Sequence, residues 1–438
     1  MKNLLFLFLL VFLNLKIYAQ NNSEMVLPSS IEVVKPIHKT SFNNENTCPE
    51  RKQGGNPRMI NGYLVFNGSM DGNRQVDPQI AVGGGYVLEA SNSGLIIFDK
   101  KGNYVQGVSQ KCFNNGIDPK LFFDIHNKVF VFDLWWYYDE AKTKPVNVSV
   151  SETDDPTGAW NIYPISRTEE VDGGGIGYSK KWIGYSYPGG EENMFVMRMN
   201  EAKAGKPATI YHFKMDLGQP IFMQDKIDDL YFFKIEDELF IISKVSENTD
   251  GIPYIQTVSS KPHHLNYIDY PPQSPQKGTD QKVSSGDRNP KNVVFQNGNI
   301  WFSQAVNCEG SSAVQWHQID AKSGDIVQTG LIKSDVTNYI QTTIAVNKNE
   351  DVLIGFQTVD KHSYISPRFT FRKGNDPLGT TREIISVGEG KGATDGASWG
   401  DYSGSIIDGD NLNDLWTIQS ITNQEGKGET VIVKIPNK

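Results

Sequence analysis

Cysteine is scarce in this sequence. Its 438 residues include three cysteines, Cys48, Cys112 and Cys308, so at most one disulfide can form within the chain. No Cys-x-x-Cys pair and no Cys–His cluster at zinc-finger spacing occurs, and we expect neither a bound metal nor a cofactor. Hydrophobic residues make up 38% of the chain. The fold must therefore depend on an apolar core.

Basic residues are too few to balance the acidic ones. The chain has 42 Lys and Arg against 51 Asp and Glu, and its formal net charge is −9. Nucleic-acid binding needs a basic face, so this balance argues against a nucleic-acid partner. An anionic sugar is still a possible ligand, because a few local Arg or Lys side chains can outweigh the total charge.

Long hydrophobic runs are absent except at the N-terminus, which reads MKNLLFLFLLVFLNLKIYAQ. Lysines flank this run, and Ala19 offers a cleavage point before Gln20, as in a signal peptide. No cysteine follows the run, which argues against a lipoprotein, and no other stretch could span a bilayer. We expect residues 1–19 to be a signal peptide and the protein to be exported to the periplasm or the extracellular space.

Helical periodicity is nearly absent, whereas strand–turn–strand units recur. One unit reads IDPKLFFDIHNKVFVFDLWWYY, with a polar turn between two apolar strands. Seven such units, spaced roughly 40–60 residues apart, begin at Val76, Ile117, Gly175, Asp228, Asn289, Tyr339 and Gly400. Further hairpins separate the units, so each supplies about four short antiparallel strands.

This repeat predicts a seven-bladed β-propeller of four-stranded antiparallel blades. The last unit lacks a fourth strand after TVIVKI, and GYLVFNG at Gly62–Gly68 has no partner in the first unit. Pairing these two segments would close the ring and remove an open sheet edge. We expect residues 20–57 to form a leader or linker that drapes over the propeller, and residues 58–438 to form the propeller of a monomer.

Propeller topology sorts the loops between two faces. The loops entering the innermost strands and those joining each second strand to the third share one face, here called the loop face. We expect the ligand there, because aromatic rings stack on sugars and charged groups select hydroxyls or carboxylates. The predicted binding residues on this face are Arg74, Trp136, Tyr138, Trp399 and Tyr402.

Three residues of the loop face are candidates for catalysis. Tyr187 ends a strand just before a Pro-Gly-Gly loop, and His362 lies on a comparable loop and titrates near neutral pH. Arg288 precedes an inner strand and could neutralise an anionic ligand. Aspartates in Asp-Pro pairs, such as Asp77 and Asp118, are interpreted as structural turn caps.

Four segments carry a resemblance to known proteins: DPQIAV, DPKLFFDIHNKVFVF, SETDDPTGAW and WGDYSGSIID. From about Gly62 onward the chain resembles a broad group of exported bacterial β-propeller proteins. Within this group, similarity to propeller-type ulvan lyases implies β-elimination on uronate-containing polysaccharides, or dehydration of a terminal uronate. Those lyases use a His pair with Tyr and Arg, and the second and third units here have no matching His pair.

The resemblance therefore implies an exported carbon–oxygen lyase acting by β-elimination on an acidic oligosaccharide or polysaccharide. Two alternatives stay open. A non-catalytic propeller that binds glycans or proteins predicts an aromatic platform without a Tyr/His/Arg cluster. A glycoside hydrolase predicts two facing carboxylates, and the sequence contains too many acids to choose a pair.

Overall fold

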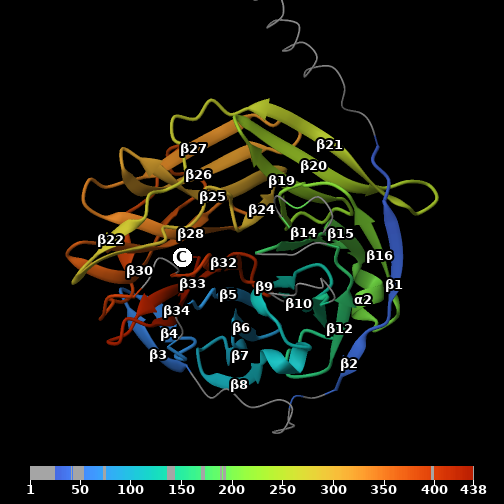
Figure 1. Ribbon diagram of the computed structural model, residues 1–438, viewed down its shortest axis with the longest axis horizontal. Helices are drawn as coiled ribbons and strands as arrows, with labels where there is room; N and C mark the ends of the chain where they lie inside the picture. Colours follow the sequence, from blue (N-terminus) through green and yellow to red (C-terminus); the bar gives the residue numbers. More distant parts are fainter. Residues whose placement is uncertain are drawn as a thin grey trace, which may run out of the picture.

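The computed structural model describes residues 25–40, 42, 54–72, 75–135, 144–168, 173–187, 190, 194–395 and 399–437. Strands dominate these residues, and the helices among them are the 3₁₀ turn η1 (Gln110–Phe113) and the short α2 (Met199–Lys203). No helix of the described chain is long and apolar enough to cross a membrane. The sheets are arranged around a common axis (Figure 1). The chain is an all-β propeller, as predicted, and the number of strands differs from one sheet to another.

The first two sheets follow the predicted hairpins. The first has the order β5 (Gln79–Gly83), β6 (Tyr86–Ser91), β7 (Gly94–Asp99), β8 (Tyr104–Ser109). The second contains β9 (Ile117–Asp124), β10 (Val129–Trp135), β11 (Val146–Ser151) and β12 (Trp160–Ile165), with β2 (Ile37–Lys39) added at its outer edge. The second sheet thus has five strands rather than the predicted four.

A ten-stranded sheet follows, which the sequence did not predict. Its order is β1 (Ser30–Val34), β16 (Ala208–Phe213), β15 (Met194–Arg198), β14 (Trp182–Ser186), β13 (Gly175–Tyr178), β18 (Phe222–Met223), β24 (Val293–Gln296), β25 (Asn299–Cys308), β26 (Ser311–Asp320), β27 (Ile326–Ile332). All neighbours are antiparallel except at β18, which pairs parallel with both β13 and β24. Two antiparallel groups are therefore joined at the axis.

The next sheet corrects one predicted unit. Its order is β17 (Gln219–Pro220), β19 (Leu230–Glu236), β20 (Leu239–Glu247), β21 (Pro253–Pro262). The sequence placed the hairpin of β19 and β20 innermost, but the extended segment of β17 and β18 occupies that place. A separate hairpin, β22 (Ser274–Gln276) and β23 (Thr279–Val283), lies in the long loop before β24.

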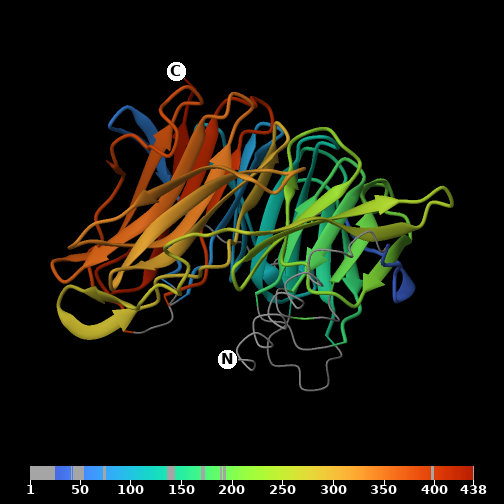
Figure 2. The ribbon, with the colours of Figure 1, turned by 90° about the horizontal axis from the view of Figure 1, so that it is seen from above.

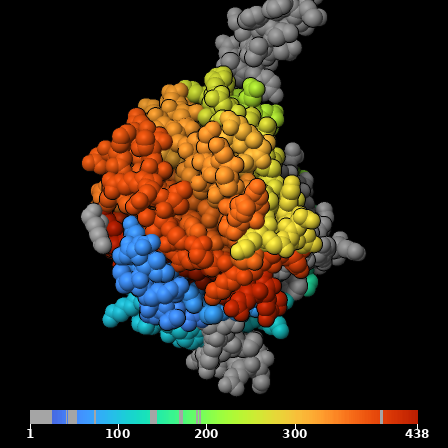
Figure 3. Space-filling view, turned by 90° about the vertical axis from the view of Figure 1, so that its left-hand side faces the viewer, coloured from blue at the N-terminus to red at the C-terminus, as the bar shows by residue number. Residues whose placement is uncertain are grey.

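The last two sheets complete the ring. One has the order β28 (Asn338–Val346), β29 (Val352–Asp360), β30 (Ser363–Arg372), β31 (Ile385–Ser386). The other has the order β3 (Gly55–Ile60), β4 (Tyr63–Asn67), β34 (Gly428–Ile435), β33 (Leu415–Thr422), β32 (Gly404–Ile407). Residues of β34 pair antiparallel with β4, from Val431↔Asn67 to Lys434↔Leu64, which confirms the predicted closure. Figure 3 shows the blue N-terminal segment beside the red C-terminal strands.

Part of the predicted leader lies along the outer edges of three sheets. Val26 bridges Ile255 of β21, β1 pairs with β16, and β2 pairs with β12. The segment therefore covers edges that would otherwise expose unpaired backbone groups. The blue strands β1 and β2 follow the rim of the molecule in Figure 1.

The core fills the spaces between neighbouring sheets, which stand side by side in Figure 2. Near the axis, the ring of Phe122 on β9 stacks on Tyr178 of β13 with centroids 4.7 Å apart. Tyr178 in turn lies 6.0 Å from the ring of Phe222 on β18. Cys112 is disulfide-bonded, whereas Cys308 is free and buried.

Candidate functional site

Two inner strands begin at aspartates with an unusual backbone conformation. Asp77 precedes β5 with φ of 47°, and Asp118 lies near the start of β9 with φ of 50°. Both precede a proline, where an extended conformation is favoured, and positive φ is uncommon outside glycine. Both side chains are nearly buried, at 2% and 8% exposure. Their interpretation as simple turn caps was therefore incomplete.

The Lys120 side chain, two residues after Asp118, is enclosed by the protein. The residue is 3% exposed, and its Nζ lies 2.8 Å from the ring centroid of Tyr402. Among the described residues, this Nζ has no hydrogen-bond partner. Burial and the nearby charge of Lys291 lower the pKa of Lys120 to about 7. The amine can therefore gain or lose a proton near neutral pH.

Two buried carboxyl groups lie around this lysine. Asp133 of β10 is paired with Lys120 in register, and its Oδ1 accepts a hydrogen bond from the Lys120 backbone N–H at 2.5 Å. Burial raises the pKa of Asp133 to about 7. Asp77 accepts hydrogen bonds from the backbone N–H of Asp401 at 2.6 Å and from Nδ2 of Asn92 at 2.9 Å. Burial, together with the charge of Asp401, raises the pKa of Asp77 to about 6.

Two tyrosines complete this group. Tyr185 and Tyr402 are buried, and burial raises the pKa of each well above 10, helped by the negative charge of Asp133 on Tyr185. The positive charge of Arg167 acts on Tyr185 in the opposite direction. Tyr187 is half-buried and lies close enough to Tyr185 to raise the pKa of its hydroxyl. Both buried hydroxyls therefore keep their protons at neutral pH.

We call Asp77, Lys120, Asp133, Tyr185 and Tyr402 the axial cluster. Buried polar atoms in proteins are nearly always hydrogen-bonded. Four atoms of the cluster are not, within the part of the chain that the structure describes: Lys120 Nζ, Asp133 Oδ2, Tyr185 Oη and Tyr402 Oη. Strongly shifted pKa values are typical of functional sites. The axial cluster can exchange protons near pH 7 and has unused hydrogen-bonding capacity.

A cavity of about 310 Å³ lies on the loop face beside β17, β19 and the loop before β24. The guanidinium of Arg288 stacks over the ring of Tyr270 at 4.7 Å, and its Nη1 donates to the carbonyl of Ile268 at 3.4 Å. Lys234 also lines the cavity and forms an ion pair with Asp216 at 3.2 Å. The cavity thus combines two cations, one carboxylate and two aromatic side chains, and because Lys234 is also paired with Glu236 at 3.1 Å, Arg288 is the cation suited to an anionic sugar.

Two glycines bring the axial cluster close to this cavity. A Cβ atom on Gly174 would lie 2.1 Å from Oη of Tyr185, so only glycine fits there. A Cβ atom on the adjacent Gly175 would lie 2.1 Å from Oε1 of Gln219, which lines the cavity. Lys291, whose charge lowers the pKa of the buried lysine, directly follows the cavity wall in the sequence. The cavity and the axial cluster are therefore neighbours.

The structure brings together three of the predicted site residues and separates two. Arg288 lines the cavity, Tyr402 belongs to the axial cluster, and Tyr187 adjoins it. His362 is exposed on the turn between β29 and β30. Trp399 is 2% exposed and donates its Nε1–H to a buried glutamine, so it packs inside the protein.

Three further predicted residues, Arg74, Trp136 and Tyr138, lie outside the described residues. Sequence reasoning missed Lys120 and Asp133, whereas Tyr185 was placed on the loop face beside Tyr187. A signal for the first two was present, because a tight turn at residues 125–128 fixes the hairpin register that sets Lys120 opposite Asp133. A lysine and an aspartate paired inside an apolar hairpin are unusual enough to single out.

Among the described residues, no group of three or more His, Cys, Asp and Glu side chains is arranged to hold a metal ion. Nδ1 of the buried His317 forms a hydrogen bond of 2.9 Å with Oγ1 of Thr329. Burial lowers the pKa of His317 to about 3, so this ring is neutral. His263 packs against the ring of Phe240 with centroids 4.7 Å apart.

No protein-family model matches the sequence, and no curated protein matches it. Solved structures with a similar arrangement include a protein of unknown function from Dyadobacter fermentans DSM 18053, at 10% identity and a TM-score of 0.38, over 94% of this chain and 100% of that one. TolB from Acinetobacter baumannii shows 10% identity and a TM-score of 0.32, over 82% and 80%. An α-L-arabinofuranosidase from Clostridium thermocellum ATCC 27405 shows 13% identity and a TM-score of 0.34, over 72% of this chain and 95% of that one. Sequence identities and TM-scores this low do not support assigning the function of any of these proteins to this chain.

Proposed function

We propose that the protein is an exported carbon–oxygen lyase that acts on a uronate-containing carbohydrate. The observation that carries the proposal is the position of the Arg288 cavity next to the axial cluster. The cavity offers positive charge and an aromatic ring to an acidic sugar. The cluster offers groups that exchange protons near neutral pH.

β-Elimination on a uronate needs three contributions from a protein. A cation must stabilise the carboxylate as charge develops on it, a base must remove the C5 proton, and an acid must protonate the departing C4 oxygen. The C5–H and C4–O bonds break, and a C4=C5 double bond forms. If the departing oxygen belongs to a sugar, the enzyme is a polysaccharide lyase, whereas a departing hydroxyl makes it a dehydratase.

We assign these contributions to residues of the cavity and the cluster. Arg288 neutralises the substrate carboxylate, and Tyr187 removes the C5 proton. A tyrosine needs a nearby cation to act as a base, because its ordinary pKa is about 10. Arg167 supplies positive charge at Tyr185, which adjoins Tyr187. Lys120 and Asp133, with pKa values near 7, hold and return the transferred proton.

We further infer that the sheets represent seven blades. The ten-stranded sheet divides at β18 into two antiparallel groups, because the pairings of β18 with both neighbours are parallel. The inner strands then follow the chain as β5, β9, β13, the β17–β18 segment, β24, β28 and β32. The strand β4 supplies the fourth position of the last blade, and β3 lies outside it.

The test is incubation with uronate-rich polysaccharides and oligosaccharides, followed by ultraviolet absorbance of the conjugated double bond. We expect absorbance to rise with time for the wild-type protein and to rise much more slowly for Arg288→Gln. Thr279→Ala, a change on the β22–β23 hairpin outside the cavity, is the matched control and should behave as wild type. No absorbance change with any uronate-rich glycan would reject the lyase.

One observation favours a glycoside hydrolase as a second candidate. The pKa values of Asp77 and Asp133 are raised to about 6 and about 7, so either carboxyl group could act as a general acid at neutral pH. A hydrolase would release new reducing ends without producing the conjugated double bond. Measuring both signals in one digest therefore separates the two reactions, and binding without either signal would indicate a non-catalytic glycan-binding protein.

A further inference from the structure

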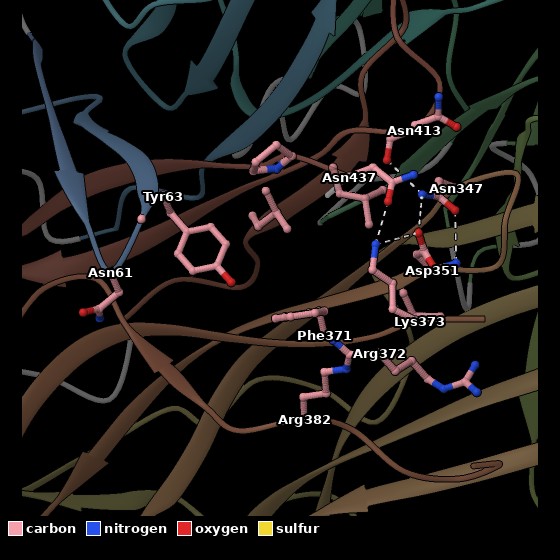
Figure 4. Close-up of a pocket in the computed structure, with 15 residues that line it drawn as sticks. Asn61, Tyr63, Asn347, Asp351, Phe371, Arg372, Lys373, Arg382, Asn413 and Asn437 are labelled. Atoms are coloured by element: carbon pink, nitrogen blue, oxygen red, sulfur yellow. Dashed lines mark hydrogen bonds and ion pairs between the residues drawn. The ribbon is translucent and has the colours of Figure 1, made fainter. Parts of the chain in front are cut away.

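A second cavity, of about 180 Å³, lies on the face opposite the loop face (Figure 4). The β3–β4 turn, the turn between β28 and β29, the end of β30, and the end of β34 form its walls. It therefore lies at the junction where the N-terminal strands close the propeller. It is smaller than cavities for drug-sized ligands, which measure about 300–1,000 Å³, and suits a single small ring.

One wall of this cavity is polar. Lys373 Nζ donates to Asn437 Oδ1 at 2.6 Å and forms an ion pair with Asp351 Oδ2 at 3.3 Å. Asn347 Nδ2 donates to the same Asp351 oxygen at 3.1 Å. Figure 4 shows these side chains gathered on one side, together with Asn413. Carboxamide groups and a fixed ammonium group are suited to hydroxyl and carboxylate ligands.

The facing wall is aromatic and carries unused donors. The Tyr63 ring contacts Phe369 edge to face, at 5.0 Å between centroids, and its phenol points into the cavity (Figure 4). Among the described residues, no hydrogen bond to Tyr63 Oη is present. Arg382 uses Nε and Nη2 to bind Asp376 at 2.8 and 3.0 Å, which leaves Nη1 free of partners in the described chain.

A carboxylate on the ligand would find its donor at Nη1 of Arg382, which Asp376 does not use. Arg372, Lys373 and Arg382 line the cavity, and Asp351 is the carboxylate in its wall. Asp376, which binds Arg382, and Glu383, whose charge acts on the Tyr63 phenol, add negative charge, so the cavity as a whole carries no excess of positive charge. A polyhydroxy ring with a carboxylate would pack its C–H face on Tyr63, bind the cations, and bond its hydroxyls to the asparagines.

We propose that this cavity binds a single acidic sugar, such as a hexuronate, at the junction between the first and last strands of the propeller. The site is separate from the cavity at Arg288, and its existence does not depend on lyase activity. Binding would join the β3–β4 turn to β30 and β34. A ligand that binds only the folded protein raises its stability, so occupancy should also strengthen the closure of the ring.

The test is calorimetric titration of the full chain with D-glucuronate and, as a neutral probe, D-glucose, alongside thermal unfolding. We expect saturable binding of D-glucuronate, weaker binding of D-glucose, and a melting temperature that rises with D-glucuronate. Arg382→Gln should lower the affinity for D-glucuronate by roughly tenfold or more, the scale of a charge-assisted hydrogen bond. Tyr63→Phe removes only the free hydroxyl and should lower it less.

Thr279→Ala, which lies on the β22–β23 hairpin outside both cavities, is the control and should leave the rise in melting temperature unchanged. Equal affinity of wild type and both variants would overturn the proposal, as would the absence of saturable D-glucuronate binding by the wild type. Loss of the melting shift in Arg288→Gln but not in Arg382→Gln would place the ligand at the loop face and also overturn it. If Arg382→Gln does not fold, the test rests on whether Tyr63→Phe lowers the affinity for D-glucuronate.

Discussion

Two clusters of lysine and aspartate lie on opposite faces of the propeller, and they differ in their hydrogen bonding. On the face opposite the loop face, Lys100 Nζ binds Asp408 Oδ1 at 2.5 Å and Asp410 Oδ2 at 2.6 Å. The other Asp408 oxygen accepts from Trp416 Nε1 at 3.1 Å. In the axial cluster, by contrast, Lys120 Nζ and Asp133 Oδ2 have no partner among the described residues.

The paired cluster has a clear structural role. Asp410 also accepts hydrogen bonds from the backbone N–H groups of Gly84 and Gly85, so the first sheet is tied to the last. Burial alone would raise the pKa of Asp410, but the hydrogen bond from Lys100 and those from the backbone outweigh it and lower the pKa. The axial cluster has the same residue types without such pairing. The two clusters therefore differ in hydrogen bonding and also in burial, since Lys120 and Asp133 are enclosed whereas the side chains of Lys100 and Asp410 are 21% and 38% exposed.

The largest effect is expected for Asp408→Ala. This change leaves Lys100 and the Trp416 indole N–H without their shared carboxylate, and removing one partner of a buried ion pair costs about 3–5 kcal/mol. Because the Lys100 side chain is 21% exposed, water can compensate in part, and we expect a loss of about 3 kcal/mol. Urea unfolding measures it. Asp410→Ala, at a more exposed partner of the same lysine, should cost less, and equal costs would contradict the assigned pairing.

The second effect concerns activity. Tyr187→Phe keeps the aromatic ring and removes only the hydroxyl, so turnover on a uronate glycan should fall by roughly 100-fold, the usual scale of acid–base catalysis. The fold should persist, as circular dichroism would show. Tyr364→Phe removes a hydroxyl from β30, away from the cavity and the cluster, and should leave turnover unchanged. Full activity of Tyr187→Phe would reopen the assignment of the base and return attention to His362.

Much of the fold could be predicted from the sequence, because it depends on local patterns. Alternating apolar residues and turn residues marked the inner hairpins, and the missing strand after β34 predicted the pairing with β4. The error at β17–β18 has a physical reason: Gln219–Met223 is short, contains a proline, and pairs in parallel with distant strands. The strands β1 and β2 of the leader were not predicted either, because the pairing of a strand with a sheet edge, such as β1 with β16, depends on few features of the sequence.

The site was less predictable than the fold. Loop topology assigned Arg288, Tyr187 and Tyr402 to the loop face without requiring side-chain positions, and the structure places them in or beside the cavity and the axial cluster, while their roles stay predictions. Lys120 was missed because its role depends on what surrounds it, namely burial and the Lys291 charge. His362 lies on an exposed turn of the loop face and does not line the cavity, and its catalytic role stays a prediction.

A third effect should appear in the pH dependence of stability. Asp133 has a folded pKa of about 7, above its unfolded value of about 3.9, so the free energy of unfolding should fall as pH rises from about 4 to about 7. Lys120 has a folded pKa of about 7, below its unfolded value of about 10.4, so stability should recover between about pH 7 and about pH 10. The cluster thus contributes a stability minimum near pH 7.

Urea unfolding across this pH range measures the minimum, with a slope of at most about 1.4 kcal/mol per pH unit from each group. Asp133→Asn mimics the protonated carboxyl group at every pH. The fall in stability between pH 4 and pH 7 should therefore shrink in this variant, while the recovery above pH 7 persists. An identical profile for wild type and Asp133→Asn would show that this carboxyl group ionises normally.

The smallest effect on stability is expected for Lys120→Met. Methionine fills a similar length with apolar atoms, and replacing an unpaired buried charge by an apolar side chain is often neutral or stabilising. We expect the free energy of unfolding to stay within about 1 kcal/mol of wild type, whereas Lys100→Met should cost about 3 kcal/mol because it strands Asp408. Turnover on a uronate glycan should nevertheless fall in Lys120→Met, because the proton acceptor is lost. If the two methionine variants destabilised the protein equally, the charge of Lys120 would be structural, and the axial cluster would be of the same kind as the Lys100 network.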